Sequence, residues 1–278
     1  MKHLSNRQLF FEYVAVPAEL ADAPEYVKAE GIYLIDVDGK KYVDLVSGVS
    51  VSNIGHGHPK VLKAVQEQTE KYMHLMVYGE FIQSPQVQYA KLLADNLPPS
   101  LQSVFFVNSG SEAIEGALKL AKRITGRTEI ISFKNAYHGS THGALSVLGN
   151  EEMKYAFRPL LPEIRQINFN VVEELEQITE KTACVLIEPI QAEAGIIIPS
   201  KEYILALRNH CDKVGVLLIF DEIQMGFGRT GKLFAFEHFG IAPDMICLAK
   251  AMGGGMPLGA FISSQENMNQ LKHHPALG

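Results

Sequence analysis

Short apolar runs alternate with helical patterns between about residue 104 and residue 263. The runs expected to form strands are residues 104–107, 129–133, 165–169, 183–188, 216–221, 245–250 and 259–263. Between them, apolar residues recur at helical spacing after residue 111 and at residues 171–181 and 201–213. Nearly continuous apolar strands separated by helices are typical of a mostly parallel sheet that is covered on both faces. We therefore predict an α/β fold built on a seven-stranded, mostly parallel sheet.

The first hundred residues follow a different pattern. Two short apolar runs flank Asp38 and Gly39, a pair that favours a tight hairpin turn. Helical spacing is found again at residues 60–72 and 84–96. We expect a small hairpin followed by two helices before the main sheet.

The composition is that of an ordinary globular protein of 278 residues, 47% of them hydrophobic. A net charge of −6 and an isoelectric point near 5.9 give no basic surface for nucleic acid or an anionic membrane. No stretch approaches the roughly 18 apolar residues of a membrane span, and residues 1–17 lack the apolar core of a signal peptide. Three cysteines, an odd number, suit a reducing compartment. We expect a cytoplasmic protein with no nucleic-acid or membrane partner.

Two ionisable residues stand where apolar strands are expected to end. Asp221 closes the run at 216–221 and Lys250 closes the run at 245–250, and glycine-rich turns follow both. The carboxyl ends of strands in an open α/β sheet face the ligand crevice. An acid and an amine delivered there together suit pyridoxal phosphate, which needs a lysine for its Schiff base and an acid for its pyridine nitrogen. The alternative for Lys250 is a solvated lysine at a strand end.

The segment between the first strand of the sheet and the next helix is suited to a phosphate. Gly110 lets the backbone approach a ligand, Ser111 adds a hydroxyl, and the free amides at a helix start attract an anion. A plain helix cap by Ser109 or Ser111 is the alternative. Downstream, Tyr137 is expected at the same sheet edge, where its ring can stack on a planar cofactor. A half-buried tyrosine in a turn gives the same pattern.

Other patterns offer weaker indications of ligand chemistry. Glu188, like Asp221, is a carboxylate at the end of an apolar strand, which is costly unless it is paired or caps a helix. Residues 226–231 match the dinucleotide fingerprint G-x-G-x-x-G, but they stand away from the strand end and no acid-ended strand follows at the required distance. His56 and His58 lack acidic or cysteine partners nearby and are typical of turn residues at a helix start. We predict neither nicotinamide binding nor a metal site.

Taken together and in this order, these motifs resemble those of the class III, or ω-amino acid, aminotransferases of the fold type I pyridoxal-phosphate superfamily. Acetylornithine, ornithine and 4-aminobutyrate aminotransferases are similar examples, and the resemblance runs from about Gly31 to the last residue. The cofactor-binding residues that it implies are Gly110, Ser111, Tyr137, Glu188, Asp221, Ile223, Gln224 and Lys250. In this pattern Lys250 and Asp221 are catalytic: the lysine forms the Schiff base and the aspartate pairs with the pyridine nitrogen.

The resemblance also implies how the other residues act. Gly110 and Ser111 bind the cofactor phosphate, and Tyr137 stacks on the ring. Ile223 packs beneath the ring, and Gln224 bonds its phenolic oxygen. Glu188 supports this network.

Two residues are implied to face the substrate. Glu193 resembles an acid that gates a C-terminal arginine in ornithine and 4-aminobutyrate enzymes, and Val49 occupies a position where ornithine aminotransferases have tyrosine. Close relatives also have an arginine two places after the glycine that matches Gly139, where it holds a substrate carboxylate. This chain has Thr141 there, so the usual pairing of glutamate with 2-oxoglutarate is not expected to follow from the family alone.

The activity implied by the resemblance is transfer of an amino group between an amino acid or ω-amine and a keto acid, in a homodimer. The implied domains are an N-terminal part of a small domain at residues 1–58 and a large cofactor-binding domain at residues 59–278. The C-terminal part of the small domain is expected to be missing, so the chain resembles a truncated member. A pyridoxal-phosphate aminomutase of the same fold, or an inactive truncated fragment, would show the same motifs.

Overall fold

The computed structural model describes residues 4–17, 23–76 and 79–273. Residue contacts divide the chain into two units, which are Met1–Val49 with Ile54–Met73, and Ser50–Asn53 with His74–Gly278. Residues 59–73 are grouped with the first of these, whereas the sequence-based division at residue 58 assigns them to the large domain. That division into family domains stays a prediction. Residues 274–278, to which the family resemblance extends, lie outside the described residues.

The smaller unit contains an antiparallel sheet of order β1-β2-β3. Its elements are α1 (Asn6–Tyr13), β1 (Tyr26–Glu30), β2 (Tyr33–Asp36), β3 (Lys41–Val43) and α3 (Pro59–Thr69). The predicted hairpin is confirmed: Gly39 has a φ of +80°, and Asp36 Oδ1 accepts hydrogen bonds from the amides of Asp38 and Lys40. His58 precedes Pro59 at the start of α3, as expected for a turn residue at a helix start. His56 was wrongly expected to lack an acidic partner, because its Nε2 lies 2.7 Å from Asp44 Oδ2.

The larger unit is built on a seven-stranded sheet of order β4-β10-β9-β8-β7-β5-β6. Its strands are β4 (Ser103–Val107), β5 (Glu129–Phe133), β6 (Ile164–Ile167), β7 (Thr182–Ile187), β8 (Leu217–Asp221), β9 (Met245–Leu248) and β10 (Gly259–Ser263). Only β10 pairs antiparallel with its neighbours, so the predicted mostly parallel α/β sheet is confirmed among the described residues.

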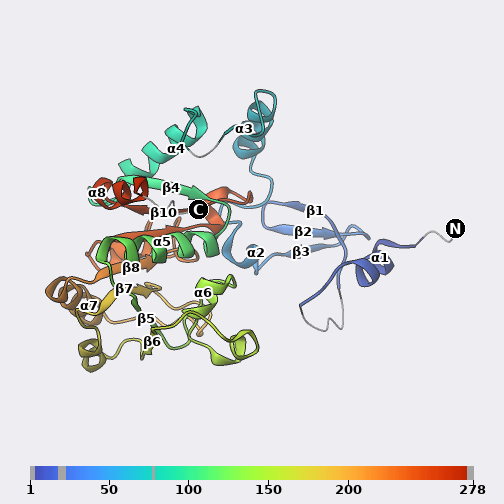
Figure 1. Ribbon diagram of the computed structural model, residues 1–278. Helices are drawn as coiled ribbons and strands as arrows, with labels where there is room; N and C mark the ends of the chain where they lie inside the picture. Colours follow the sequence, from blue (N-terminus) through green and yellow to red (C-terminus); the bar gives the residue numbers. More distant parts are fainter. Residues whose placement is uncertain (1–3, 18–22, 77–78, 274–278) are drawn as a thin grey trace. The chain divides into compact units, whose positions relative to one another are not determined.

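Helices cover both faces of this sheet (Figure 1). They are α4 (Ser84–Asp95), α5 (Gly110–Thr125), α6 (His142–Ser146), α7 (Lys201–Val214) and α8 (Gln265–Asn269). Short 3-10 helices connect them, at η1 (Glu151–Met153), η2 (Tyr155–Phe157), η3 (Val172–Gln177), η4 (Ala235–His238), η5 (Lys250–Gly253) and η6 (Gln270–Lys272). α5 packs on one face with Cys184 and Leu186 of β7, whereas Val185 and Ile187 of the same strand pack with α7 on the other. Burial on both faces is why the central strands β7, β8 and β9 are apolar at nearly every position.

Two sequence-based predictions differ from the structure. β9 ends at Leu248, and Lys250 starts η5 with a φ of +49°, so the lysine lies just beyond the strand and does not end it. Residues 171–181 form only the 3-10 helix η3 and not an α-helix. Leu175 within η3 and Ile178 at its C-cap are the buried anchors, and their spacing of three matches the 3-10 repeat.

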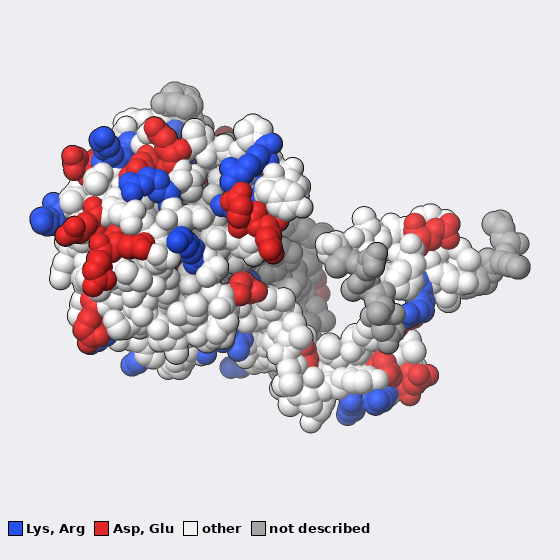
Figure 2. Space-filling view, turned by 90° about the horizontal axis from the view of Figure 1, so that it is seen from below, with Lys and Arg blue, Asp and Glu red and all other residues white. Residues whose placement is uncertain are grey.

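The surface of the larger unit carries both signs of charge. Figure 2 shows Lys and Arg side chains interspersed with Asp and Glu on the face in view.

Within the described part of the chain, no helix combines the length and apolarity needed to cross a bilayer. All three cysteines are buried and unpaired.

Candidate functional site

A cavity of about 430 Å³ lies where the carboxyl ends of β4, β7, β8 and β9 meet. This volume is in the range of small-molecule sites. Every residue predicted to bind the cofactor lines it: Gly110, Ser111, Tyr137, Glu188, Asp221, Ile223, Gln224 and Lys250. The parallel strands explain this convergence, because their carboxyl ends share one edge of the sheet.

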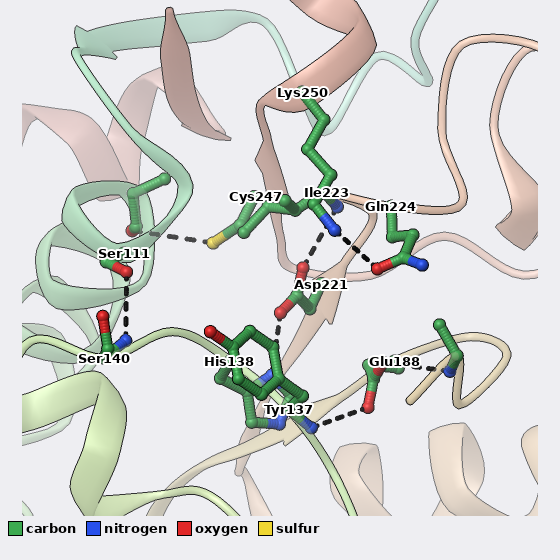
Figure 3. A network of polar contacts seen from close by, with 12 residues as sticks. Ser111, Tyr137, His138, Ser140, Glu188, Asp221, Ile223, Gln224, Cys247 and Lys250 are labelled. Atoms are coloured by element: carbon green, nitrogen blue, oxygen red, sulfur yellow. Dashed lines mark hydrogen bonds and ion pairs between the residues drawn. The ribbon is translucent and has the colours of Figure 1, made fainter. Parts of the chain in front are cut away.

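Lys250 reaches into this cavity from the turn after β9 (Figure 3). Its Nζ donates a hydrogen bond to Gln224 Oε1 at 2.5 Å. Burial lowers the pKa of Lys250, although the nearby carboxylates of Asp221, Glu193 and Glu188 oppose that shift. A lowered pKa raises the fraction of neutral amine, the form that is nucleophilic.

Asp221 is held by two hydrogen bonds at the end of β8 (Figure 3). Its Oδ1 accepts from the amide of Ile223 at 3.0 Å, and its Oδ2 lies 2.7 Å from His138 Nδ1. The side chains of both members of the pair are almost completely buried. His138 Nε2 has no hydrogen-bond partner among the described residues. His138 was not among the predicted site residues, and only its place beside Tyr137 could have suggested this role.

Glu188 follows β7 and also faces the cavity. Its Oε2 accepts from the amide of Tyr137 at 3.1 Å and its Oε1 from the amide of Ala192 at 3.2 Å. Burial raises the pKa of Glu188 to about 7, and the charge of Asp221 adds to the effect. The carboxyl group therefore ties the loop that carries Tyr137 to the end of β7.

Ser109 and Ser111 at the start of α5 could each cap the helix or bind a ligand on the sequence alone, and the structure gives them different contacts. Ser109 caps the helix, because its Oγ accepts from the amide of Glu112 at 3.2 Å. Ser111, two residues further in the same first turn, lines the cavity, and its Oγ accepts from the amide of Ser140 at 3.3 Å. The free amides of a helix start favour an anion at this end of the cavity.

Two glycines allow the close packing around this helix start. A Cβ at Gly110 would lie 2.9 Å from Ile223 Cδ1, and one at Gly139 would lie 2.2 Å from Ser111 Oγ. Gly139 also has a φ of +122°, which side chains rarely adopt. Both positions therefore favour glycine.

A carboxylate outside the cavity fixes the loop that follows Gly139. Glu115 Oε1 on α5 accepts from Thr141 Oγ1 at 2.6 Å and from the amides of Gly143 and Ala144 at 2.8 and 3.1 Å. The hydroxyl of Thr141 is thus engaged with α5, and Thr141 is absent from the described cavity lining. Sequence reasoning missed Glu115, because a glutamate in an amphipathic helix is usually a solvated side chain.

The two predicted substrate residues are not part of this lining among the described residues. Glu193 is exposed in the loop after β7, although its charge acts on the pKa of Lys250. Val49 belongs to the smaller unit and lies in α2 (Ser47–Ser50), a left-handed turn in which every residue has a positive φ. Such a turn is strained for a β-branched residue.

The glycine-rich segment at 226–231 does not open a helix. Residues 223–230 form consecutive turns, and the next helical element is η4. The dinucleotide fingerprint requires a helix start at these glycines, and this segment lacks one. Glu222, next to Asp221, instead caps the start of η4 beyond this segment, since its carboxylate accepts from the amides of Ala235 and Phe236 at 2.9 and 2.7 Å.

Known proteins resemble this chain over almost its whole length. The family model for class III aminotransferases matches residues 17–276. An acetylornithine aminotransferase of Methanopyrus kandleri is 46% identical over 86% of this chain and 61% of its own length. A [LysW]-aminoadipate semialdehyde/glutamate semialdehyde transaminase of Sulfurisphaera tokodaii is 43% identical over 84% of this chain and 60% of its own length.

Solved structures share the fold. The taurine:2-oxoglutarate aminotransferase of Bifidobacterium kashiwanohense, in complex with PLP and glutamate, matches with a TM-score of 0.87 and 32% identity. That match covers 99% of this chain and 68% of the other. The chain thus spans about three fifths of the length of the curated relatives it matches. On the family model and these identities, the chain belongs to the class III aminotransferases.

Proposed function

We propose that the protein containing this chain transfers an amino group between an amino acid or ω-amine and a keto acid, with pyridoxal phosphate bound in the cavity of the larger unit. The observation that carries the proposal is the meeting of Lys250 and Asp221 in one cavity beside the start of α5. The family membership of the chain supports the same reaction class.

The residues around the cavity fit this cofactor. Its phosphate suits the amides at the start of α5 and the hydroxyl of Ser111, where Gly110 and Gly139 leave room for close approach. Its ring suits the space between Tyr137 and Ile223, which both line the cavity. Asp221 is the buried acid that a pyridine nitrogen requires, and the structure orients it through His138.

When bound, pyridoxal phosphate supplies a carbonyl that condenses with amines and a ring that accepts electrons from the substrate carbon. Lys250 Nζ would hold the cofactor covalently, and as a free amine it would take and return a proton at that carbon. Its lowered pKa favours this exchange. Asp221, kept in place by His138 Nδ1 and the amide of Ile223, holds a proton on the ring nitrogen. Gln224 orients the free lysine amine before the cofactor binds.

The covalent attachment is tested by reduction and mapping. The full-length protein loaded with pyridoxal phosphate should retain the label after borohydride reduction, and peptide mapping should find it on Lys250, because burial lowers the pKa of this amine inside the cavity. Lys154, which is also buried and has a lowered pKa, is the internal comparison, since its Nζ donates to the carbonyl of Leu148 at 2.8 Å. Label found on Lys154 or any other lysine would refute the assignment.

For the complete protein we propose a homodimer in the cytoplasm, with small amino donors and keto acids as its partners. The family resemblance supports the dimer, because its members complete the phosphate site with a segment of the neighbouring subunit. Sedimentation of the loaded full-length protein should give the mass of two chains. An active species that sediments as a single chain would rule the dimer out.

A further inference from the structure

Lys250 lies in a turn with an unfavourable backbone. Its φ of +49° places a residue with a side chain in the left-handed region, and Gly254 and Gly255 follow with φ values of +59° and +104°. Such a conformation at a non-glycine residue persists only where the surrounding structure holds it. Residues 249–256 are called here the lysine turn.

The backbone hydrogen bonds inside the lysine turn are local. They run from the amide of Met252 to the carbonyl of Ala249, from Gly254 to Ala251 and from Met256 to Gly253. Each joins residues that are close in sequence, so these bonds shape the turn without fixing it to the rest of the unit.

Tyr89 on α4 supplies a bond from a distant element. Its hydroxyl donates to the carbonyl of Met252 at 2.9 Å, across a separation of 163 residues. Its ring stacks on Phe106 of β4, with the centroids 5.9 Å apart and the planes at 22°. Burial raises the pKa of Tyr89 to about 12, so the hydroxyl keeps its proton and remains a donor. Among the described residues, it is the one hydrogen bond that joins the backbone of the lysine turn to another element.

We propose that Tyr89 is a positioning residue, whose hydroxyl fixes the lysine turn and so sets the place of Lys250 Nζ against Gln224 and Asp221. Met252 is two residues after Lys250 and is buried in the same apolar cluster against which Tyr89 packs. A displacement of the Met252 carbonyl therefore moves the backbone from which Lys250 extends. The chemical role of Lys250 Nζ in this proposal rests on the proposed function. The hydrogen bond from Tyr89 to Met252 does not depend on that function, because it follows from the contacts alone.

The effect of the hydrogen bond from Tyr89 to Met252 should be measurable without an assay of catalysis. In Tyr89→Phe the ring and its stacking on Phe106 remain, and only the hydroxyl is removed. Hydrogen exchange of amides in the lysine turn should become roughly three- to tenfold faster, in the full-length protein with and without pyridoxal phosphate, because one hydrogen bond is lost. Exchange in β7, at the centre of the sheet, should stay unchanged. An unchanged lysine turn, or an equal acceleration in β7, would overturn the proposal.

The effect of Tyr89 on Lys250 is measured separately, in the protein loaded with pyridoxal phosphate. In the loaded protein, the pH at which the absorbance of the lysine-bound cofactor changes should shift in Tyr89→Phe, and kcat should fall roughly three- to tenfold with little change in KM. Tyr203→Phe is the matched control, since it removes the hydroxyl of a buried tyrosine on α7, outside the described cavity lining. That control should leave both readouts as in the wild type. An equal change in Tyr203→Phe, or none in Tyr89→Phe, would reject the positioning role.

The two hypotheses fail separately. Cofactor mapped to a lysine other than Lys250 would refute the proposed function. The rate of amide hydrogen exchange in the cofactor-free protein would still decide whether Tyr89 holds the lysine turn. Cofactor on Lys250 with normal exchange in Tyr89→Phe would leave the function standing and reject the role of Tyr89.

Discussion

Replacing Asp221 with asparagine should lower the rate of amino transfer by on the order of a hundred- to a thousandfold while pyridoxal phosphate still binds. The amide has nearly the same shape, so it can keep one of the two hydrogen bonds that now come from His138 Nδ1 and the amide of Ile223. It carries no charge, and therefore it cannot stabilise a proton on the ring nitrogen. Single-turnover kinetics with an amino donor, together with the absorbance of bound cofactor, measure the two effects separately.

The matched control for this substitution is Asp212→Asn. Asp212 lies on α7, is 63% exposed and pairs with Arg208 at 2.5 Å, so its charge acts at the surface. Loss of such a pair contributes little, and amino transfer should stay at the wild-type rate. Wild-type turnover in Asp221→Asn would mean that another group holds the ring nitrogen.

Much of the sheet could be predicted from the sequence, because its strands are buried on both faces. β7 shows why: every residue from Thr182 to Ile187 is buried, so the run has no polar break that could be mistaken for a helix face. The lysine turn could not be predicted in this way. The apolar run continues to Ala249 without interruption, and the reversal of φ at Lys250 depends on glycines and on Tyr89, which lies far away in sequence.

The candidate site also has residues that could be predicted from the sequence and residues that could not. Acids and a lysine next to apolar runs are visible in the sequence, because charge beside such a run is costly without a function or a partner. The partners themselves are not visible. His138 meets Asp221 across 83 residues, and Glu115 meets Thr141 across 26. Contacts of this kind follow from the order of strands in the sheet, which periodicity does not specify.

Glu115 also changes what an arginine at position 141 should do. The family resemblance implies an arginine where this chain has Thr141, in a position to hold a substrate carboxylate. In this chain Glu115 Oε1 lies 2.6 Å from the hydroxyl of Thr141. An arginine introduced by Thr141→Arg would pair with that carboxylate, because a guanidinium next to a partly buried glutamate forms a charge-assisted bond. Its effect on the substrate should therefore be small unless the charge of Glu115 is removed.

The double substitution Thr141→Arg with Glu115→Gln separates these effects. The amide oxygen of glutamine can still accept from the amides of Gly143 and Ala144, which bond Glu115 Oε1, so the loop should keep its shape. The freed guanidinium should then favour 2-oxoglutarate over pyruvate, since only the former has a second carboxylate for a bidentate partner.

The expected change in the ratio of kcat/KM for the two acceptors is about ten- to a hundredfold, which is the contribution of one hydrogen bond to a charged group. Steady-state kinetics with both acceptors measure it, and Glu115→Gln alone is the control, with a ratio equal to that of the wild type. Thr141→Arg alone should fall between the control and the double variant, because Glu115 competes with the substrate for the guanidinium. A ratio that stays at the wild-type value in the double variant would show that the protein binds the substrate carboxylate elsewhere, and that Thr141 holds its loop without setting specificity.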